Sequence, residues 1–453
     1  MKLAVQILIV IVVVSIAANI VFAQQKIIVG YYPSWMSVAL PPSAIEYQNL
    51  THIAHAFVAP NADGSISYSD GFSLLPSLIS TAHLHNVKVM ISLGGWGNSA
   101  GFSPMAADTA ARHRFVQNLK NFCVTNGYDG ADVDWEYPAG SDKTNLTLLV
   151  HELRQAFNAV NPPLQLSLAA PSTDWSGKNF DFASLQNDVS WIGIMTYDYY
   201  TGMKMAGPNS ALYGNFSTNS QGWVDYSVQY FSLTRGIAKQ KLLIGIPFYG
   251  MLFNASKLYG TSTTAGTSAL YSTVLPKLLL GWTRNWDEQG KVPYLVNSTQ
   301  TQIISYDDSE SVALKCDYVL NQDLGGTIIW ALGQDLIDGK EALLDVVGNT
   351  LGMVSSAPVV SNAEDPSSFA VYQNYPNPFN GETRIQYAIP ENGMVRIMLY
   401  DVMGRLVSTI VDREETAGTH MALFSLPALA SGIYIYRITW QGSSLAKTMV
   451  VLR

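Results

Sequence analysis

The chain has 453 residues, of which 48% are hydrophobic and only 13% are charged. This length and composition fit one large domain followed by a small one, and they exclude a largely disordered protein. The formal net charge is −8 and the sequence pI is about 5.3, which argues against nucleic acid as a partner, because phosphate backbones are bound by basic surfaces.

The first 23 residues have the composition of a secretory signal peptide. One lysine precedes an unbroken apolar run over residues 7–14, and Ala23 places a small residue at the expected cleavage point. A membrane anchor is the alternative, but Ser15 and Asn19 shorten the apolar core below the length of a membrane span. We therefore predict that the signal is removed and that the rest of the chain is exported.

Apolar stretches of strand length then alternate with helix-periodic stretches. The predicted strands are residues 27–32, 51–58, 87–92, 130–134, 164–169, 191–196, 242–247 and 327–332. The clearest predicted helices are residues 107–126, 145–160 and 221–239. Strands that alternate with helices imply parallel strands joined by right-handed crossovers, and eight such units close into a (β/α)8 barrel. We predict this α/β barrel for residues 24–352, with an active site at the carboxyl ends of its strands.

One connection is too long for an ordinary loop of such a barrel. Between Gly250 and Gly325 the chain contains strand-like pieces at residues 291–296 and 301–305 and a helix at 309–320. We predict a small α+β insertion, over about residues 251–310, that forms one wall of a groove.

Only two cysteines occur in the chain, Cys123 and Cys316. They could pair after export, but each falls in a predicted helix, and the two helices are far apart in the sequence. We expect two separate buried thiols.

The composition changes after the barrel. Residues 353–368 are rich in Ser, Ala, Pro and Val, which is typical of a linker. Over residues 369–453, short predicted strands alternate with turn signals, at residues 383–389, 394–400, 406–411, 420–425, 432–439 and 446–452. This pattern predicts a small antiparallel β-sandwich.

The most informative stretch is an acidic strand end. Asp132, Asp134 and Glu136 lie two residues apart, so on a strand they point to one face. Val133 and Trp135 take the opposite face and favour burial of the strand. Three carboxylates in one buried place repel each other, so at least one should hold a proton near neutral pH, which is the state that a general acid requires.

Aromatic, hydroxyl and acidic side chains also gather at the ends of the other predicted strands. These ends meet at one edge of a barrel, so the side chains are expected to converge on the acids. Each tyrosine or tryptophan alone could be core packing, but their recurrence at strand ends favours a binding cleft. The candidates are Tyr31, Ser92, Trp96, Tyr197, Asp198, Tyr249 and Trp330, with Tyr137 directly after the last acid.

The stretch from Asp129 to Glu136 resembles the D-x-x-D-x-D-x-E signature of glycoside hydrolase family 18, the chitinases. Its companions follow in order: SLGG at residues 92–95, MTYD at residues 195–198, and Trp330 on the last strand. Residues 207–213 and 304–308 also resemble bacterial members of the family. The resemblance covers roughly residues 26–351 and implies a barrel that hydrolyses β-1,4-linked N-acetylglucosamine polymers, with no metal or cofactor.

Carried over residue by residue, the resemblance implies substrate-assisted, retaining catalysis. Glu136 would protonate the glycosidic oxygen, Asp134 would hold the acetamido N–H, and Tyr197 would donate to the acetamido oxygen. Asp132 would share a proton with Asp134. The other candidates would support the acids or bind the sugars; they are Tyr31, Ser92, Trp96, Tyr137, Asp198, Tyr249 and Trp330.

Two positions depart from the usual family pattern. Met251 stands where an arginine is common, and Ala331 stands where a glutamate is common, which affects sugar contacts rather than the acid. An endo-β-N-acetylglucosaminidase acting on N-glycans would share the barrel and the acid, and a chitin-binding lectin would usually lack the acid. The insertion and the MTYD motif at residues 195–198 favour a chitinase over the glucosaminidase, and the presence of Glu136 argues against the lectin. We expect a monomeric chitinase that binds chitin or N-acetylglucosamine oligosaccharides.

The C-terminal region resembles a second module, the type A C-terminal sorting domain of the type IX secretion system. The similarity is carried by residues 375–380 (YPNPFN), 399–407 (LYDVMGRLV), 431–436 (SGIYIY) and 447–453. It implies recognition by the type IX machinery, followed by release from the cell or attachment to its surface. A carbohydrate-binding or spacer sandwich is the alternative.

Overall fold

The structure is a computed structural model that describes three parts of the chain. It covers residues 25–215, 222–352 and, in the C-terminal region, 369–372, 374, 377, 379, 381–401, 404–425 and 429–451. The predicted signal peptide (1–23) and linker (353–368) lie outside the described residues. Within the described residues, no helix is both long enough and apolar enough to cross a membrane.

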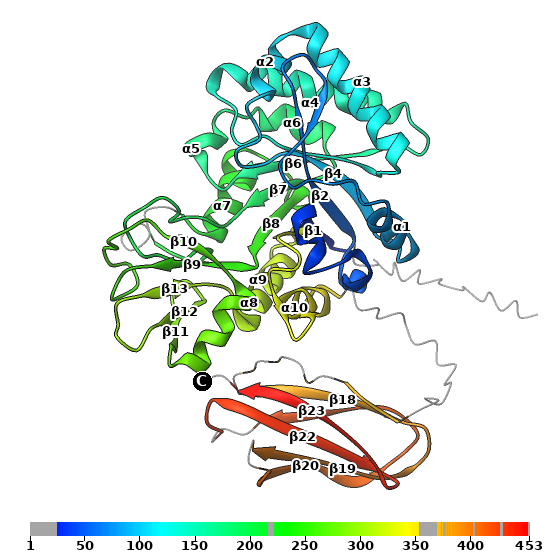
Figure 1. Cartoon of the computed structure of the whole chain (residues 1–453), viewed down its shortest axis with the longest axis vertical. Coiled ribbons are helices and arrows are strands. Elements are labelled where there is room, and N and C mark those ends of the chain that lie inside the picture. The colour runs from blue at the N-terminus through cyan, green and yellow to red at the C-terminus, as the bar shows by residue number, and fades with distance from the viewer. Residues whose placement is uncertain are drawn as a thin grey trace, which may run out of the picture.

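Eight parallel strands close into a barrel, as predicted (Figure 1). In order around the barrel they are β1 (Ile27–Pro33), β2 (His52–Pro60), β4 (Lys88–Gly94), β5 (Gly130–Asp134), β6 (Gln165–Pro171), β7 (Ile192–Met195), β8 (Leu242–Pro247) and β14 (Gly326–Trp330). The barrel closes because β1 pairs with both β14 and β2. A short strand, β3 (Ile66–Tyr68), adds to β2 in the antiparallel sense.

Helices connect most of these strands and surround the barrel (Figure 1). They are α1 (Pro76–Leu84), α2 (Phe102–Ala107), α3 (Thr109–Asn126), α4 (Lys143–Asn158), α5 (Asp174–Gly177), α6 (Phe182–Asp188), α7 (Val224–Gln229), α9 (Ser309–Asn321) and α10 (Ala342–Thr350). The predicted helix 107–126 is α3, and Asp108 caps its first turn by accepting a hydrogen bond of 2.7 Å from the backbone N–H of Ala111. The first unit differs, since only 3-10 turns join β1 to β2.

The predicted helix 221–239 is wrong at its C-terminal end. After α7 the chain continues as a π-helical turn over Tyr230–Thr234 and then leaves the helix, with Gly236 at a left-handed φ of 70°. Arg235 stabilises this exit, because its guanidinium donates to the carbonyl oxygens of Gly177 and Phe180.

The insertion between β8 and β14 contains a five-stranded antiparallel sheet (Figure 1). In sheet order the strands are β10 (Thr267–Leu270), β9 (Tyr249–Phe253), β13 (Ile303–Ser305), β12 (Val292–Val296) and β11 (Thr283–Asp287), with α8 (Tyr271–Val274) following β10. The strand-like pieces predicted at residues 291–296 and 301–305 are thus β12 and β13. A small hairpin, β15 (Leu336–Ile337) and β16 (Lys340–Glu341), follows β14.

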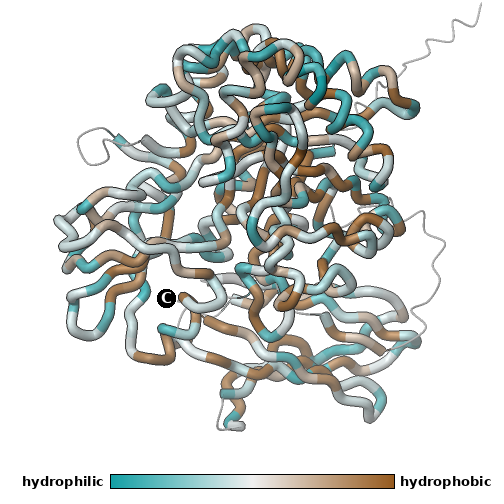
Figure 2. The backbone as a smooth tube through the Cα atoms, turned by 45° about the horizontal axis from the view of Figure 1, so that its top comes forward, coloured by the Kyte–Doolittle hydropathy of each residue, from teal (hydrophilic) through white to brown (hydrophobic). Residues whose placement is uncertain are grey.

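The barrel core is apolar on the outer side of the strands. Apolar residues follow the barrel strands in Figure 2. Val133 and Trp135 are buried there, as predicted, and the Trp135 ring stacks on Phe102 at a centroid distance of 4.9 Å. Cys123 and Cys316 are separate, free and buried, which confirms the prediction for both. Packing of this outer face leaves the inner face of β5 to the acids.

The C-terminal region forms two antiparallel sheets. One contains β17 (Ala370–Val371), β18 (Glu382–Ile389) and β21 (Gly418–Ser425), and the other contains β20 (Leu406–Glu415), β19 (Gly393–Asp401), β22 (Gly432–Trp440) and β23 (Ser443–Val451). All six predicted strands are present. Buried side chains from both sheets form one apolar cluster that includes Ile385, Tyr387, Ile397, Tyr436 and Ile438, so the region has its own core.

Candidate active site

Asp132 lies in a row of polar side chains across three neighbouring strands. The strand register places Ser92 of β4 and Ser167 of β6 directly opposite Asp132 of β5. Ser92 Oγ donates to Asp132 Oδ2 at 3.0 Å, and Ser167 Oγ donates to Asp132 Oδ1 at 2.6 Å. Tyr31 of β1 adds a third hydrogen bond, from its hydroxyl to Asp132 Oδ2 at 2.8 Å.

These contacts determine how Asp132 carries charge. Burial raises the pKa of Asp132, because the ionised form is poorly solvated there. The hydrogen bonds from Ser167, Tyr31 and Ser92 oppose that rise, since hydroxyl donors stabilise a carboxylate. Asp132 is therefore the member of the acidic trio that is best equipped to hold a negative charge.

Asp134 has the opposite surroundings. It is buried, and among the described residues its Oδ1 atom has no hydrogen-bond partner. Burial, followed by the charges of Glu136 and Asp132, raises the pKa of Asp134 well above its ordinary value. Its surroundings therefore favour the protonated form of Asp134, and its unpaired oxygen is free for a polar group of a ligand.

Glu136 is half-buried just beyond the end of β5. Its backbone N–H donates to Ser99 Oγ at 2.9 Å, which fixes the chain where it leaves the strand. Burial raises the pKa of Glu136 to about 7, with a smaller rise from the charge of Asp198 and an opposing hydrogen bond with Tyr137. A carboxyl group with this pKa can both give and take a proton near neutral pH.

Two glycines at the end of β4 let the chain pass close to the acidic end of β5. Gly94 and Gly95 both have left-handed φ angles, of 97° and 75°. A Cβ atom on Gly94 would lie 2.4 Å from the Asp134 carbonyl oxygen, and the Gly95 N–H donates to the same oxygen at 2.8 Å. The SLGG sequence thus lets β4 and its loop approach the acidic strand end closely.

Tyr197 and Asp198 extend from the end of β7 toward the acids. Tyr197 is buried, and its pKa is raised well above the ordinary value by burial and by the charges of Asp134 and Asp198. Its hydroxyl is therefore a neutral donor. Gly245 of β8 leaves space for the ring, because a Cβ atom there would lie 2.6 Å from Tyr197 Cε1.

Tyr249 takes a different position from the sugar-stacking ring that the sequence suggests. Its ring is only 6% exposed, at a centroid distance of 6.1 Å from the Tyr197 ring. Its hydroxyl donates to Asp198 Oδ1 at 2.8 Å. Tyr249 therefore offers a hydrogen bond to Asp198 and has little free ring surface for a sugar.

The three other aromatic candidates, Trp330, Trp96 and Tyr137, differ in their surroundings. Trp330 is partly exposed and packs against Tyr31 and Phe57, at centroid distances of 5.7 and 5.6 Å. Trp96 is 79% exposed and has no ring contact within the described residues, so the structure does not join it to the acids. Tyr137 packs edge-on against Trp175 at 4.8 Å.

Three residues contact the predicted site residues but were not themselves predicted from the sequence, namely Ser167, Trp175 and Phe57. The signal for Ser167 was a lone hydroxyl in the apolar strand LSLAAP. Trp175 lies on α5 and is 59% exposed. It follows the end of β6, and at the other strands this is where the site residues are predicted. Phe57 carried no such signal.

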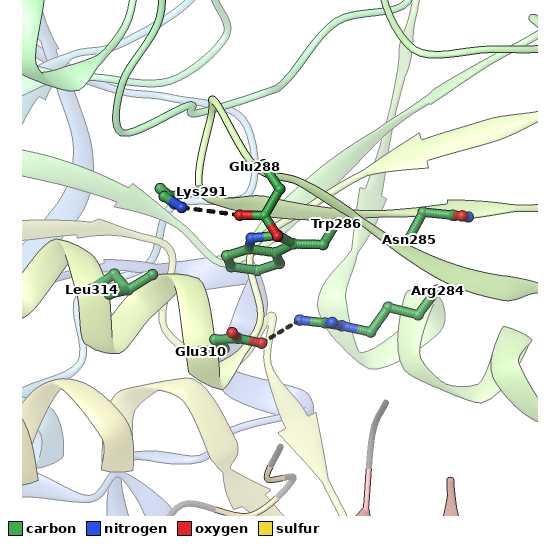
Figure 3. Close-up of a pocket in the computed structure, with 7 residues that line it drawn as sticks. All are labelled: Arg284, Asn285, Trp286, Glu288, Lys291, Glu310 and Leu314. Carbon is green, nitrogen blue, oxygen red and sulfur yellow. Dashed lines mark hydrogen bonds and ion pairs between the residues drawn. The ribbon is translucent and has the colours of Figure 1, made fainter. Parts of the chain in front are cut away.

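A separate cavity of about 380 Å³ lies on the insertion, between β11 and α9 (Figure 3). Its charged side chains already pair with each other, since Arg284 contacts Glu310 at 2.8 Å and Lys291 contacts Glu288 at 3.0 Å. Arg284 also lies over the Trp286 ring. None of the acids of β5 lines this cavity, so it is separate from the acidic group at the barrel mouth. In the described part of the chain, no group of three or more His, Cys, Asp or Glu side chains is arranged to hold a metal ion.

Two regions of the chain match known protein families. Residues 27–335 match the family model described as glycosyl hydrolases family 18, and residues 373–452 match the one described as secretion system C-terminal sorting domain. The second match marks the chain for export by the type IX secretion system, to the medium or the cell surface.

Individual relatives have been found as well. The chain is 34% identical over 323 residues to a probable endochitinase of Caenorhabditis elegans (63% of this chain, 51% of that protein). It is 31% identical over 287 residues to chitinase A1 of Niallia circulans (55% of this chain, 41% of that protein). The chain thus spans about half or less of the length of these two relatives.

A solved structure extends the comparison to the fold. The group IV chitinase of Ostrinia furnacalis in complex with allosamidin has a TM-score of 0.66 and 27% identity, over 73% of this chain and 100% of that one. The match to the family model covers more than half of the chain and includes every strand of the barrel. The chain therefore belongs to glycosyl hydrolases family 18.

Proposed function

We propose that this protein is an exported chitinase that hydrolyses β-1,4 bonds between N-acetylglucosamine residues. The observation that carries the proposal is the pairing of Asp134, whose Oδ1 is buried and unpaired, with Glu136, whose pKa is about 7. A substrate acetamido N–H would satisfy the first group, and a glycosidic oxygen would take the proton of the second. The relatives described above, which are themselves named chitinases, support the same substrate class.

The first step that we propose breaks the glycosidic bond. Glu136 gives its proton to the glycosidic oxygen as the bond from C1 to that oxygen breaks, and the acetamido carbonyl oxygen of the same sugar bonds to C1 from the opposite face. Asp134 accepts the acetamido N–H with its unpaired oxygen, and the negative charge that Asp134 and Asp132 share, with one proton between them, offsets the positive charge of the resulting oxazolinium ring. Tyr197 donates its hydroxyl to the acetamido oxygen and orients it for attack.

The second step opens the ring. Glu136, now ionised, takes a proton from water, and the water oxygen bonds to C1 while the bond to the acetamido oxygen breaks. Two displacements at C1 retain its configuration, and family 18 is a recognised exception to hydrolysis by two protein carboxylates. Asp132 shares one proton with Asp134, and its three hydroxyl donors stabilise the negative charge when it lies on Asp132.

The surroundings of Asp198 support the use of a substrate nucleophile. Asp198 follows the end of β7, and its charge raises the pKa of Glu136. Its Oδ1 atom already accepts hydrogen bonds from Tyr249 at 2.8 Å and Thr201 at 3.0 Å. We assign Asp198 to the binding of sugar hydroxyls, with the aromatic rings of Trp330 and Trp96 as stacking surfaces.

Product analysis on chitin oligomers beside an N-glycosylated protein tests the proposal. We expect shortened chitin oligomers and an intact glycoprotein. Release of glycans from the glycoprotein alone would support an endo-β-N-acetylglucosaminidase, which can use the same acids. Binding of oligomers with no products from either substrate would indicate a lectin.

A further inference from the structure

Asn209 is a buried asparagine that connects the end of β7 to the insertion. It lies in the segment between β7 and α7 and is 1% exposed. Its side-chain Oδ1 accepts a hydrogen bond of 3.2 Å from the backbone N–H of Asp198, and its Nδ2 donates to the carbonyl oxygen of Tyr249 at 3.1 Å. Its backbone N–H donates to Ser305 Oγ of β13 at 2.8 Å.

These bonds surround a residue in an unusual conformation. Asp198 has a φ of 60°, in the left-handed region that residues other than glycine rarely adopt. Such a conformation persists only where neighbouring groups hold it. Asn209 bonds to the backbone on both sides of the contact between Asp198 and Tyr249, so it holds the two partners of that contact together.

We propose that Asn209 is a positioning residue, which fixes Asp198 and, through it, the adjacent Tyr197 in the orientation that the cleavage of an N-acetylglucosamine bond requires. This inference rests on the proposed function. Asn209 is too deeply buried to touch a sugar, so its effect must pass through Asp198 and Tyr197.

The next residue anchors the same strand end from a different direction. Ser210 Oγ donates to the carbonyl oxygen of Thr196 at 2.7 Å and accepts a hydrogen bond of 2.9 Å from Lys315 Nζ. Lys315 is completely buried and pairs with Asp307 at 2.5 Å. Because this second anchor remains when the Asn209 side chain is removed, the barrel and the insertion should stay joined, and the loss should be confined to the orientation of Asp198.

The test compares Asn209→Ala with the parent protein on chitin oligomers. We expect kcat to fall about 10- to 100-fold, the size of effect that a misplaced site residue has, while KM changes less than about threefold. Asn187→Ala is the matched control, because the Asn187 amide also donates to a carbonyl oxygen, that of Ala183, but is exposed on α6. That control should retain the parent's kcat.

A double-mutant cycle with Asp198→Ala distinguishes positioning from general destabilisation. If Asn209 acts partly through the Asp198 carboxylate, Asn209→Ala should lower kcat less in the Asp198→Ala background than in the parent; some effect remains because that background keeps the backbone N–H bound by Asn209. Parental kcat in Asn209→Ala, or full additivity of the two changes, would overturn the proposal. If Asn209→Ala does not fold, Ser305→Ala should lower kcat in the same direction but less, and unchanged kcat in that variant would also overturn it.

A crystal structure of Asn209→Ala provides a readout that needs no substrate. We expect Asp198 to leave its left-handed conformation and its contact with Tyr249. Unmoved Asp198 and Tyr197 would refute the positioning role even if the parent protein cleaved no chitin. An inactive parent would refute the proposed function alone.

Discussion

Ser167 Oγ lies 2.6 Å from Asp132 Oδ1 and donates a hydrogen bond to it, inside the barrel and directly across from β6 to β5. This contact completes a set of three hydroxyl donors around Asp132, whereas the Asp134 Oδ1 atom, two residues further along the strand, has no partner among the described residues. The difference favours the charged form more at Asp132 than at Asp134, whose surroundings favour the protonated form.

Removal of the Ser167 hydroxyl should therefore impair turnover. We expect Ser167→Ala to lower kcat/KM by about 10- to 100-fold, because a hydrogen bond to a charged group contributes about 1.5–3 kcal/mol. Steady-state kinetics on chitin oligomers measure the change, with Ser80→Ala on the exposed face of α1 as the control. An unchanged kcat/KM in Ser167→Ala would show that Asp132 does not depend on this donor.

The pH dependence of turnover should report Glu136. Its raised pKa, about 7, means that the acid form is present below that pH and is lost as the pH rises through it. We expect kcat/KM to fall on the alkaline side with an apparent pKa near 7. Glu136→Gln should abolish hydrolysis at every pH while binding of oligomers stays measurable by calorimetry. Full activity of that variant would contradict the role of Glu136.

A buried acidic cluster predicts how stability responds to pH. Glu341 accepts a hydrogen bond of 3.1 Å from the Glu46 N–H, and Asp335 accepts bonds of 2.7 and 3.0 Å from the N–H groups of Leu343 and Leu344 at the start of α10. Burial, together with the neighbouring Asp345, raises the pKa of Glu46 from 4.5 to about 8. Because the folded pKa is the higher one, the contribution of Glu46 to stability is greatest below about pH 4.5 and is lost as the pH rises toward 8.

Glu46→Gln should remove part of this alkaline loss. We expect the variant to melt about 2–4 °C above the parent at about pH 9, and to lie close to it at about pH 4. The expected rise in melting temperature is small because Glu46 is partly exposed and solvent screens its charge. Calorimetry at the two pH values measures the difference. A gain in melting temperature of equal size at both pH values would rule out the ionisation of Glu46 as the cause.

The sequence could predict the barrel because its strands are continuous apolar runs bounded by turn signals, and β5 shows the acids at period two within such a run. It could not predict that Ser167 faces Asp132, because strand register is set by pairing between segments that are distant in the chain. The burial of Tyr249 is a tertiary effect of the same kind. It depends on the sheet of the insertion, which covers the ring and turns the hydroxyl toward Asp198.

The C-terminal sandwich should be dispensable for catalysis but necessary for export. It has its own apolar core, so deletion of residues 369–453 is expected to leave the kcat/KM of the purified barrel unchanged. In a host with a type IX secretion system, we expect the truncated protein to accumulate in the periplasm. Cell fractionation with the full-length chain as the control measures this. Normal export of the truncated form would refute the sorting role for this chain.

The participation of the substrate's own acetamido group is tested most directly by comparing two oligomers of the same length, one fully N-acetylated and one with every acetyl group removed. The account predicts rapid cleavage of the acetylated oligomer and no detectable cleavage of the other, because without the carbonyl oxygen nothing attacks C1. Cleavage of both oligomers at similar rates would contradict it.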